Sequence, residues 1–505
     1  MDDVTGENRL PQGWLMASLE DVAKWSSGGT PSRAKPSFYL GNIPWIKTGE
    51  LGARLLKNTE EHISEEALAS SSAKIFPIGS VALAMYGATI GKTSILGVEA
   101  ATNQACAVGI PDAVSSEFLY YFLISEERAF VDAGKGGAQP NISQSIVKAW
   151  PLLLPPLGEQ TRIVAKLEEL LSDLDAGVAE LKAAQKKLAQ YRQSLLKAAV
   201  EGALTAEWRT RNTPAETGAQ LLERILLERR ARWEARQLAR FKEQGKTPPK
   251  DWQKKYPEPV QPDTTGLLEL PEGWVWATLS QAGWLDRGKS KHRPRNASHL
   301  YGGPYPFVQT GDIRHSDTYI ANVEATYSEA GLAQSRLWPV GTMCITIAAN
   351  IGKTALLSME ACFPDSVVGF LSGADHVSVR YVEYFMRSIQ QQLEDEAPAT
   401  AQKNINLEIL EKVVIPIPPI NEQLQIVQRL VDAFASASDQ ARAIGFALKQ
   451  ATAQRQNILR AAFSGQLVPQ DPADEPASVL LERIRAERAA QGAQPRKRRA
   501  AKETS

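Results

Sequence analysis

Two stretches of the chain place apolar residues three and four positions apart over most of their length. The first, residues 159–200, contains no proline, and its apolar positions are Val164, Leu167, Leu171, Leu174, Val178, Leu181, Leu188 and Leu195. The second repeats this spacing at Val427, Leu430, Phe434, Ala437, Ala441, Ile444, Leu448, Ala451 and Ile458. Such spacing is typical of a coiled-coil seam, and two such helices in one chain most simply pair with each other. We therefore expect a long antiparallel coiled coil; the alternative is that each helix packs on its own globular part.

The remaining apolar residues fall in short runs between glycines and prolines. The runs Val81–Met85 and Met343–Ile347 predict buried strands. The aromatic-rich segments Phe118–Ile124 and Tyr381–Ile389 predict short helices. Because strands and helices share each region, we expect an α/β (α+β) globular part before each long helix.

Each long helix is followed by a basic amphipathic stretch. Residues 218–243 are rich in arginine with aromatic residues between, and residues 477–490 repeat this pattern. A proline- and lysine-rich linker covers residues 247–263, and a basic run at 496–499 lies near the end of the chain. Basic helices of this kind face phosphates, a partner protein or solvent, and the sequence leaves these alternatives open.

The strongest signal is an internal repeat, which has priority over local patterns. Eight segments recur in the same order at an offset of 259 to 263 residues. Leu10-Pro11-Gln12-Gly13-Trp14 returns at 270–274, and Ile90-Gly91-Lys92-Thr93 returns at 351–354. Collinear matches of this extent do not arise by chance. The chain is therefore a tandem duplication, for which we expect pseudo-two-fold symmetry.

Together, the repeat and the helical pattern predict four segments. These are a globular part at 1–157, a central helical region at 158–263, a second globular part at 264–418, and a distal helical region with a basic tail at 419–505. In the central region we place the coiled-coil helix at 159–200, the basic helix at 218–243 and the linker at 247–263. The pairs Pro155-Pro156 and Pro418-Pro419 end a strand and start each long helix.

Composition and charge add detail to this picture. The 505 residues suffice for three or four domains, and 43% apolar with 23% charged residues is ordinary for a globular protein. The net charge is zero, but the two globular parts are net acidic and the two helical regions net basic. Three cysteines without CxxC spacing argue against a disulfide scaffold and fit a reducing compartment. No signal-peptide pattern and no apolar stretch of ~18 residues occurs, so we expect a cytoplasmic protein without a membrane contact.

Repeated motifs carry a resemblance to a known family. Each half opens with Leu-Pro-x-Gly-Trp, and each long helix opens with Pro-Pro-x-x-Glu-Gln at 155–160 and 418–423. In the first half, Gly28-Gly29-Thr30-Pro31-Ser32 precedes Ile43-Pro44-Trp45-Ile46. With these motifs in order over residues 10–490, the chain resembles the DNA-specificity subunit of type I restriction–modification systems.

This resemblance implies a function and a set of partners. It implies two target recognition domains, here 1–157 and 264–418, each reading one half of a split site in double-stranded DNA. The helices would act as a ruler between the half-sites and dock two methyltransferase subunits, with restriction (translocase) subunits completing the complex. The resemblance also implies no catalytic residues, no metal and no bound cofactor in this chain. S-adenosylmethionine, ATP and Mg would belong to the partner subunits.

The residues agree with a non-catalytic role. An amino-methyltransferase needs Asn or Asp before Pro-Pro and an aromatic residue, whereas Leu154 and Ile417 precede the two Pro-Pro pairs. Two Gly-Lys-Thr triplets suggest a phosphate-binding loop, but that motif requires glycine where Tyr86 and Ile347 stand. The five histidines show no metal-ligand spacing. The alternatives are a specificity subunit of a related type IIB-like or phage-defence methyltransferase system, and a coiled-coil adaptor with no DNA role.

Base reading in DNA requires polar and basic side chains on exposed loops, and other polar contacts hold the phosphates. In the first half the candidate DNA-binding residues on such loops are Thr30, Ser32, Arg33, Lys35, Lys47, Thr48, Tyr86, Thr89, Lys92, Gln139 and Asn141. In the second half they are Lys289, Lys291, Arg293, Arg295, Gln309, Thr310, Arg314, Asn350, Lys353, Gln402, Lys403 and Asn404. For each residue alone, a plain surface turn is an equal alternative.

The two halves share some of these residues and differ at others. Shared residues such as Thr48 and Thr310 suit the fold or phosphate contacts. Differing residues such as Arg33, Tyr86 and Asn350 suit contacts to one half-site, because the halves are expected to read different sequences. Since both globular parts are net acidic, we expect the methyltransferase subunits to supply much of the DNA affinity.

Overall fold

The computed structural model describes residues 10–492 except 136–139, 292–293, 295, 374–375 and 398–403. The chain forms two compact units. Unit 1 comprises residues 1–182 and 445–505, and unit 2 comprises residues 183–444. The division falls inside the two long helices, α6 (Leu157–Val200) and α15 (Ile420–Phe463), so each unit contains a segment of both.

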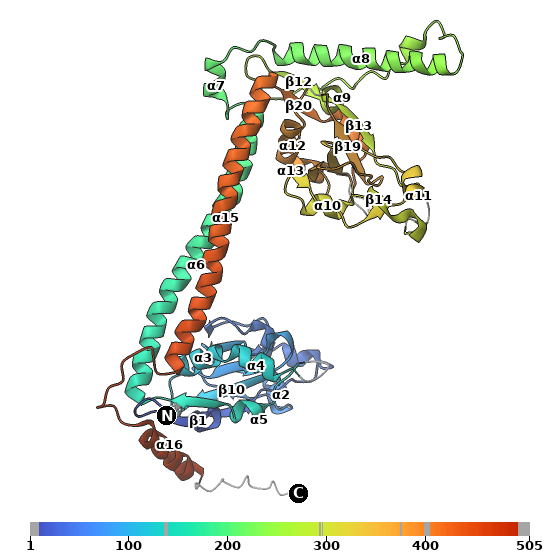
Figure 1. The fold of residues 1–505 in the computed structure, drawn as a ribbon. Helices are drawn as coiled ribbons and strands as arrows, with labels where there is room; N and C mark the ends of the chain where they lie inside the picture. Colours follow the sequence, from blue (N-terminus) through green and yellow to red (C-terminus); the bar gives the residue numbers. More distant parts are fainter. Residues whose placement is uncertain are drawn as a thin grey trace, which may run out of the picture. The chain divides into compact units, whose positions relative to one another are not determined.

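The globular part of unit 1 is built on mixed sheets (Figure 1). A five-stranded sheet has the order β2 (Ala23–Ser27), β10 (Cys106–Pro111), β7 (Val81–Ala84), β8 (Thr93–Leu96) and β4 (Leu55–Leu56). A second sheet has the order β5 (His62–Ile63), β3 (Ile43–Ile46), β9 (Ala100–Thr102) and β6 (Ile75–Phe76), and a two-stranded sheet pairs β1 (Leu15–Ser18) with β11 (Pro151–Leu154). The helices are α1 (Leu19–Val22), α2 (Glu65–Ala69), α3 (Ser116–Ser125), α4 (Glu127–Ala133) and α5 (Gln144–Lys148).

Unit 2 repeats this topology. Its five-stranded sheet has the order β13 (Trp284–Arg287), β19 (Val367–Leu371), β17 (Met343–Thr346), β18 (Thr354–Leu357) and β15 (Tyr319–Ile320). Smaller sheets pair β12 (Val275–Thr278) with β20 (Val414–Ile417) and β14 (Tyr301–Pro306) with β16 (Thr326–Tyr327). The helices are α9 (Leu279–Ala282), α10 (Thr310–His315), α11 (Glu329–Ala333), α12 (Val379–Ser388), α13 (Gln390–Glu396) and α14 (Leu407–Lys412).

The equivalent sheets confirm the duplicated α/β fold. Both five-stranded sheets end in a parallel pair, β4 with β8 and β15 with β18, while their other pairs are antiparallel. The predicted buried strands are β7 and β17, in which every residue is buried. Each ends one residue before the predicted limit, because Met85 and Ile347 lead into the next loop. The predicted aromatic helices are α3 and α12.

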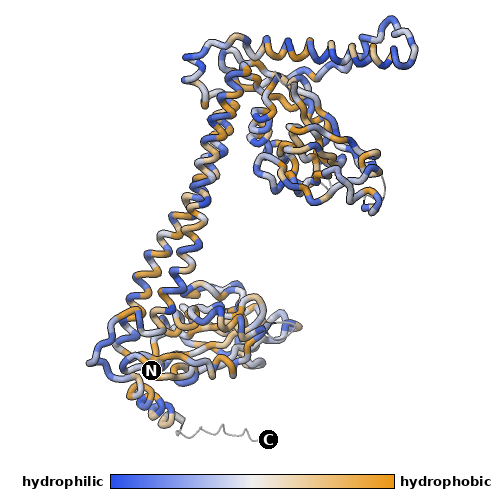
Figure 2. Tube along the Cα trace, viewed as in Figure 1, coloured by the Kyte–Doolittle hydropathy of each residue, from blue (hydrophilic) through white to orange (hydrophobic). Residues whose placement is uncertain are grey.

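The two long helices begin directly after the Pro-Pro pairs and are 44 residues each. Figure 2 shows polar and apolar residues alternating along both. In unit 1, Asp175 pairs with Arg455, and Arg162 of α6 pairs with Asp474, beyond the end of α15, at 2.6 Å. In unit 2, Arg192 Nη2 donates to Ser438 Oγ at 2.8 Å, and Arg429 donates to a carbonyl just beyond the end of α6 at 2.7 Å. Because partner numbers fall in one helix as they rise in the other, the two segments run antiparallel within each unit.

The predicted seam is only part of what these helices bury. The seam residues Leu167 and Leu430 are fully buried, but so are Ile163 and Ile426, which lie outside the predicted seam. All four residues belong to the cores of the globular parts. Ile163 and Leu167 are four residues apart, as are Ile426 and Leu430, so each pair lies on one helix face. At the helix ends the predicted seam itself therefore packs on the globular part, as the alternative interpretation held, while the antiparallel pairing of the two helices supports the coiled-coil interpretation.

Shorter helices follow the long ones. Helix α7 (Ala206–Arg211) and helix α8 (Gly218–Glu243) belong to unit 2, and α16 (Ala477–Gly492) belongs to unit 1. The predicted basic helix at 218–243 matches α8. The linker folds back on α8, where Trp252 stacks on Trp233 with ring centroids 5.8 Å apart. The basic run at 496–499 lies outside the described residues.

Among the described residues, no helix is both long and apolar enough to cross a membrane. No group of three or more His, Cys, Asp or Glu side chains among these residues could hold a metal ion.

Candidate nucleic-acid interface

The repeated motifs meet each other where the globular part joins the long helices. In unit 1, Trp14 Nε1 donates to Glu159 Oε2 at 2.9 Å, and in unit 2, Trp274 Nε1 donates to Glu422 Oε2 at 2.9 Å. Both carboxylates are buried, at 0% and 1% exposed. A glycine with positive φ precedes each tryptophan, +78° at Gly13 and +84° at Gly273, a conformation that favours glycine. These contacts explain why the tryptophan of one motif and the glutamate of the other occur together in each half.

The basic helix of each unit, α16 in unit 1 and α8 in unit 2, docks at the same junction. The backbone N–H of Ala477 in α16 donates to Gly13 O at 3.0 Å, and that of Gly218 in α8 donates to Gly273 O at 2.7 Å. The globular part of unit 1 is thereby completed by the C-terminal segment of the chain, and that of unit 2 by the central helical region. This fixes each globular part to the helices of its own unit.

The junctions differ in electrostatics. Glu422 Oε1 accepts hydrogen bonds from Thr205 Oγ1 at 2.7 Å and from Arg209 Nε and Nη2 at 2.9 and 2.8 Å. Val468 and Pro472 stand at the equivalent positions of unit 1, where no described residue donates a hydrogen bond of ordinary geometry to Glu159 Oε1. Burial therefore raises the pKa of Glu159 above its ordinary value, and the nearby Trp14 and Gln470 side chains offset only part of this effect.

The structure brings several predicted DNA-binding residues of unit 1 to one edge. Tyr86 forms a β-bridge with Asn141, and the following loop carries Thr89 and Lys92. Tyr86 is 45% exposed, and Thr89 Oγ1 donates to Tyr86 O at 2.9 Å. A tyrosine ring, an amide and an ammonium group thus stand on neighbouring exposed segments, which suits contact with a nucleic acid.

The equivalent edge of unit 2 carries different side chains on a strained loop. Ala348 forms a β-bridge with Asn404, which corresponds to the Tyr86–Asn141 bridge. The next residues, Ala349 and Asn350, have φ of +51° and +80°, a conformation that costs free energy for residues other than glycine. Both are exposed, so the loop presents the Asn350 amide to solvent. The two halves therefore share the β-bridge that anchors this loop, but the loop is one residue shorter in unit 2 and displays different side chains.

A second group of candidates in unit 1 is engaged in ion pairs. Arg33 lies 2.7 Å from Glu61 and stacks over the Tyr39 ring at 4.0 Å, and Lys47 lies 2.9 Å from Glu61. The two cations hold the pKa of Glu61 below its ordinary value. A phosphate would have to compete with Glu61 for either cation. These residues therefore suit a role in holding phosphates less than Lys92 does, which forms no ion pair with any described residue.

The other candidates have simpler surroundings. In unit 1, Thr30 hydrogen-bonds Gln104, Ser32 is exposed, Lys35 stacks over Phe38 at 4.9 Å, and Thr48 begins a short 3-10 helix. In unit 2, Lys289 and Lys291 are exposed, while Gln309 and Thr310 begin α10. Gln139, Arg293, Arg295, Gln402 and Lys403 lie outside the described residues.

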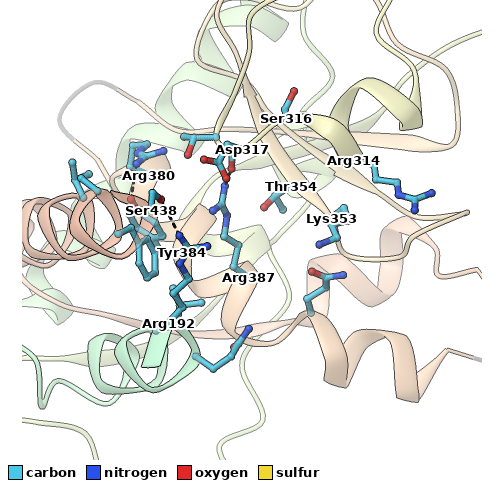
Figure 3. Close-up of a pocket in the computed structure, with 17 residues that line it drawn as sticks. Arg192, Arg314, Ser316, Asp317, Lys353, Thr354, Arg380, Tyr384, Arg387 and Ser438 are labelled. Carbon is cyan, nitrogen blue, oxygen red and sulfur yellow. Dashed lines mark hydrogen bonds between the residues drawn. The ribbon is translucent and has the colours of Figure 1, made fainter. Parts of the chain in front are cut away.

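Unit 2 contains a pocket of about 540 Å³ between its globular part and its segments of α6 and α15 (Figure 3). Its lining includes two predicted residues, Arg314 and Lys353. It also includes three arginines that sequence reasoning did not select for DNA contact, Arg192, Arg380 and Arg387. Arg380 and Arg387 are seven residues apart on α12, a spacing that places them on one helix face and was a usable signal.

A buried carboxylate holds the α12 arginines in place. Glu383 is 0% exposed and pairs with Arg387, while Arg380 Nη1 lies 3.8 Å from Glu383 Oε2. Burial raises the pKa of Glu383, and the two arginines oppose this shift. Arg380 also donates to Tyr384 Oη at 2.6 Å and stacks over that ring at 4.8 Å. The guanidinium groups are thus fixed before any ligand arrives.

Comparison with known proteins assigns this architecture. The family model described as the type I restriction modification DNA specificity domain matches twice, at residues 11–184 and 271–441. The chain is 25% identical over 497 residues to the type I restriction enzyme EcoDI specificity subunit of Escherichia coli, covering 96% of this chain and 97% of that one.

Solved structures show the same fold. A chain from a type I restriction–modification assembly superposes with a TM-score of 0.66 at 20% identity, covering 91% of this chain and 100% of that one. The HsdS subunit from Thermoanaerobacter tengcongensis superposes with a TM-score of 0.50 at 19% identity, covering 92% and 100%. The family model matches once in each half of the chain, which confirms the resemblance drawn from the repeated motifs. The chain belongs to the family of type I restriction–modification DNA-specificity subunits.

Proposed function

We propose that this chain is the non-catalytic, sequence-specific DNA-recognition subunit of a type I restriction–modification complex. Each globular part reads one half of a bipartite site in double-stranded DNA. The observation that carries this proposal is the pair of equivalent loops, which are anchored by corresponding β-bridges and differ in exposed side chains, Tyr86 in unit 1 and Asn350 in unit 2. Two readers of the same design with different displayed groups suit two unlike half-sites.

The proposed partners follow from the family. Two methyltransferase subunits would dock on the helical regions, and restriction subunits would join them. S-adenosylmethionine, ATP and Mg would bind to those partners, and this chain would bind none of them. The complex would act in the cytoplasm, where its DNA lies.

In this proposal the long helices set the gap between the half-sites. Each spans 44 residues, and at 1.5 Å per residue such a helix is roughly 66 Å long. Along B-DNA, where base pairs rise 3.4 Å, this corresponds to about two helical turns. A rod of this length suits a site whose two halves are separated by an unread spacer.

Exchange of one globular part tests the proposal. Residues 270–418 would be replaced with the equivalent part of another family member, and methylated adenines would be mapped in cells that carry the partner subunits. We expect one half of the recognised sequence to change and the other half and the gap to stay. A matched exchange of residues 11–154 should change only the other half. An unchanged recognised sequence after both exchanges would contradict the proposal and favour an adaptor without a reading role.

A further inference from the structure

The unit 2 pocket gathers more positive charge than its surroundings neutralise. Five cationic side chains line it and one acidic side chain, Asp317, does so. The cations are Arg192, Arg314, Lys353, Arg380 and Arg387. The buried Glu383 pairs with Arg380 and Arg387, so five cations face two carboxylates, Asp317 and Glu383, and a net charge of +3 remains. This excess of positive charge favours an anion in the pocket.

The five cations form two classes. Arg192, Arg380 and Arg387 are held by Ser438, Tyr384 and the buried Glu383 respectively, which fixes their direction. Arg314 and Lys353 are exposed, and neither forms an ion pair with a described residue. A fixed inner set with two free outer cations is a preorganised anion site rather than a solvated face.

Unit 1 does not repeat this charge. At the positions equivalent to Arg314, Arg380 and Arg387 it has Gly52, Glu117 and Ile124. The equivalent of Arg192 is Arg455, which is paired with Asp175, the residue that replaces Ser438.

Besides Arg455, two further cations lie near the equivalent place in unit 1. Arg54 stacks near Tyr121 but is paired with Glu168, so its charge is compensated. Lys92, the equivalent of Lys353, is exposed. The two units therefore share their fold at this position but differ in the charge of the side chains there.

The pocket adjoins the loop proposed to read bases. Lys353 follows the strained residue Asn350 by three positions on the loop between β17 and β18. A duplex whose base edges meet Asn350 would therefore bring its backbone to Lys353. Phosphates recur along each strand about every 3.4 Å of helix axis, and a row of cations on several elements matches such a row of charges better than it matches one isolated anion.

Building on the proposed function, we infer that the unit 2 pocket grips the phosphodiester backbone beside its half-site, so that the two units hold DNA unequally. Unit 2 supplies the larger salt-dependent share of the affinity through the pocket cations. Unit 1 relies more on contacts that release no counterions. An acidic segment of a partner protein is the competing occupant that the experiment must separate from DNA.

The test compares charge removal in the two units of the assembled methyltransferase complex. One variant carries Arg314→Ala with Lys353→Ala, and its matched control carries Arg54→Ala with Lys92→Ala, which removes the same formal charge. The probe is a duplex containing the sequence methylated by the wild-type complex, and affinity is measured between 50 and 200 mM salt. Each lost phosphate contact lowers the magnitude of the slope of log affinity against log salt by ~0.9.

In the unit 2 variant, we expect the slope of log affinity against log salt to decrease in magnitude by up to ~2. Over this fourfold salt range, the loss of affinity should then be about tenfold smaller than for the wild type. The unit 1 variant should change the slope by less than half as much. The co-purification of methyltransferase subunits should stay as in the wild type for both variants.

Three outcomes overturn the inference. Equal slope changes in both variants would show that the units share the phosphate contacts evenly. An unchanged slope in the unit 2 variant would show that the pocket does not touch DNA. Loss of methyltransferase co-purification with an unchanged slope would identify an acidic protein segment as the occupant. The sequence preference of the wild-type complex tests the proposed function separately. If that complex prefers its own sequence, the proposed function holds in all three cases; if it shows no sequence preference, the proposed function itself is wrong.

Discussion

The two buried glutamates at the junctions offer a matched pair of substitutions with opposite expected effects. Glu422 accepts four hydrogen bonds, one from Trp274, one from Thr205 and two from Arg209. Glu422→Gln keeps the shape but points an amide N–H₂ at donors and leaves Arg209 without its counter-charge. Breaking a buried pair costs ~3–5 kcal/mol. Because the Arg209 side chain is 21% exposed and solvent screens its charge, we expect a smaller loss of about 2–3 kcal/mol in the free energy of unfolding.

Glu159→Gln should behave differently. It keeps an acceptor for Trp14 and removes a buried charge whose second oxygen has no hydrogen-bond partner. We therefore expect no loss of stability in unit 1 at neutral pH, and a gain is the direction that the raised pKa indicates.

The pH dependence follows from the direction of that shift. A carboxyl group whose pKa is raised by folding favours the folded state when protonated, and this contribution is lost as the pH rises through the raised value. Above that pH the wild type carries the buried charge and Glu159→Gln does not. The difference between them should therefore be present at neutral pH and close as the pH falls to the ordinary carboxyl range.

Hydrogen exchange read by mass spectrometry on peptides from each junction measures both effects separately, because it reports local opening. For Glu422→Gln we expect protection of residues 270–280 to fall roughly 30- to 100-fold, since each 1.4 kcal/mol is a factor of ten. For Glu159→Gln, protection of residues 11–18 should be equal to the wild type or higher at pH 7. Equal losses in both variants, or no loss in Glu422→Gln, would refute the reasoning from the hydrogen-bond partners.

Three further expectations concern the helices and the reading loop. Inserting seven residues into both α6 and α15 lengthens each helix by about 10.5 Å. The gap between the half-sites, mapped from methylated adenines, should therefore grow by about 3 base pairs. An unchanged gap would contradict the proposal that the helices set it. Gly177 lies within α6 with open space around it, so Gly177→Ala should raise the free energy of unfolding by about 0.5–1 kcal/mol, as measured by chemical denaturation. Gly202 has a φ of +75°, and an added Cβ would lie 2.5 Å from Pro271 Cγ. Gly202→Ala should therefore lower the free energy of unfolding by more than about 1 kcal/mol. Asn350→Gly should leave thermal unfolding unchanged, because glycine readily adopts its φ of +80°, but should relax one base position in the second half-site; methylated-adenine mapping that shows the same sequence would exclude a base contact.

Much of this architecture is determined by the sequence alone. The repeat, the short strands β7 and β17, the basic helix α8 and the Pro-Pro starts of α6 and α15 all follow from local spacing, because periodicity and turn residues act over a few neighbours. The absence of a phosphate-binding loop was equally readable, since one required glycine is replaced by Tyr86 and by Ile347.

Other features depended on which distant segments meet. The bond between Trp14 and Glu159 joins residues 145 apart, and nothing in either motif names the other as its partner. The burial of Ile163 and Ile426 was missed because the apolar spacing of a helix does not say whether its partner is another helix or the globular part, and at the helix ends the seam residues Leu167 and Leu430 also pack into the globular cores.

The cationic pocket of unit 2 is the clearest feature that the sequence alone did not reveal. Its five cations lie between positions 192 and 387 of the sequence, and only the folding of α6, α10, α12 and the loop before β18 brings them around one space. In the linear sequence the globular parts are net acidic, which argued against strong DNA contact by themselves. Net charge sums over a whole surface, whereas phosphate binding depends on where the charges converge, and only the tertiary structure decides that.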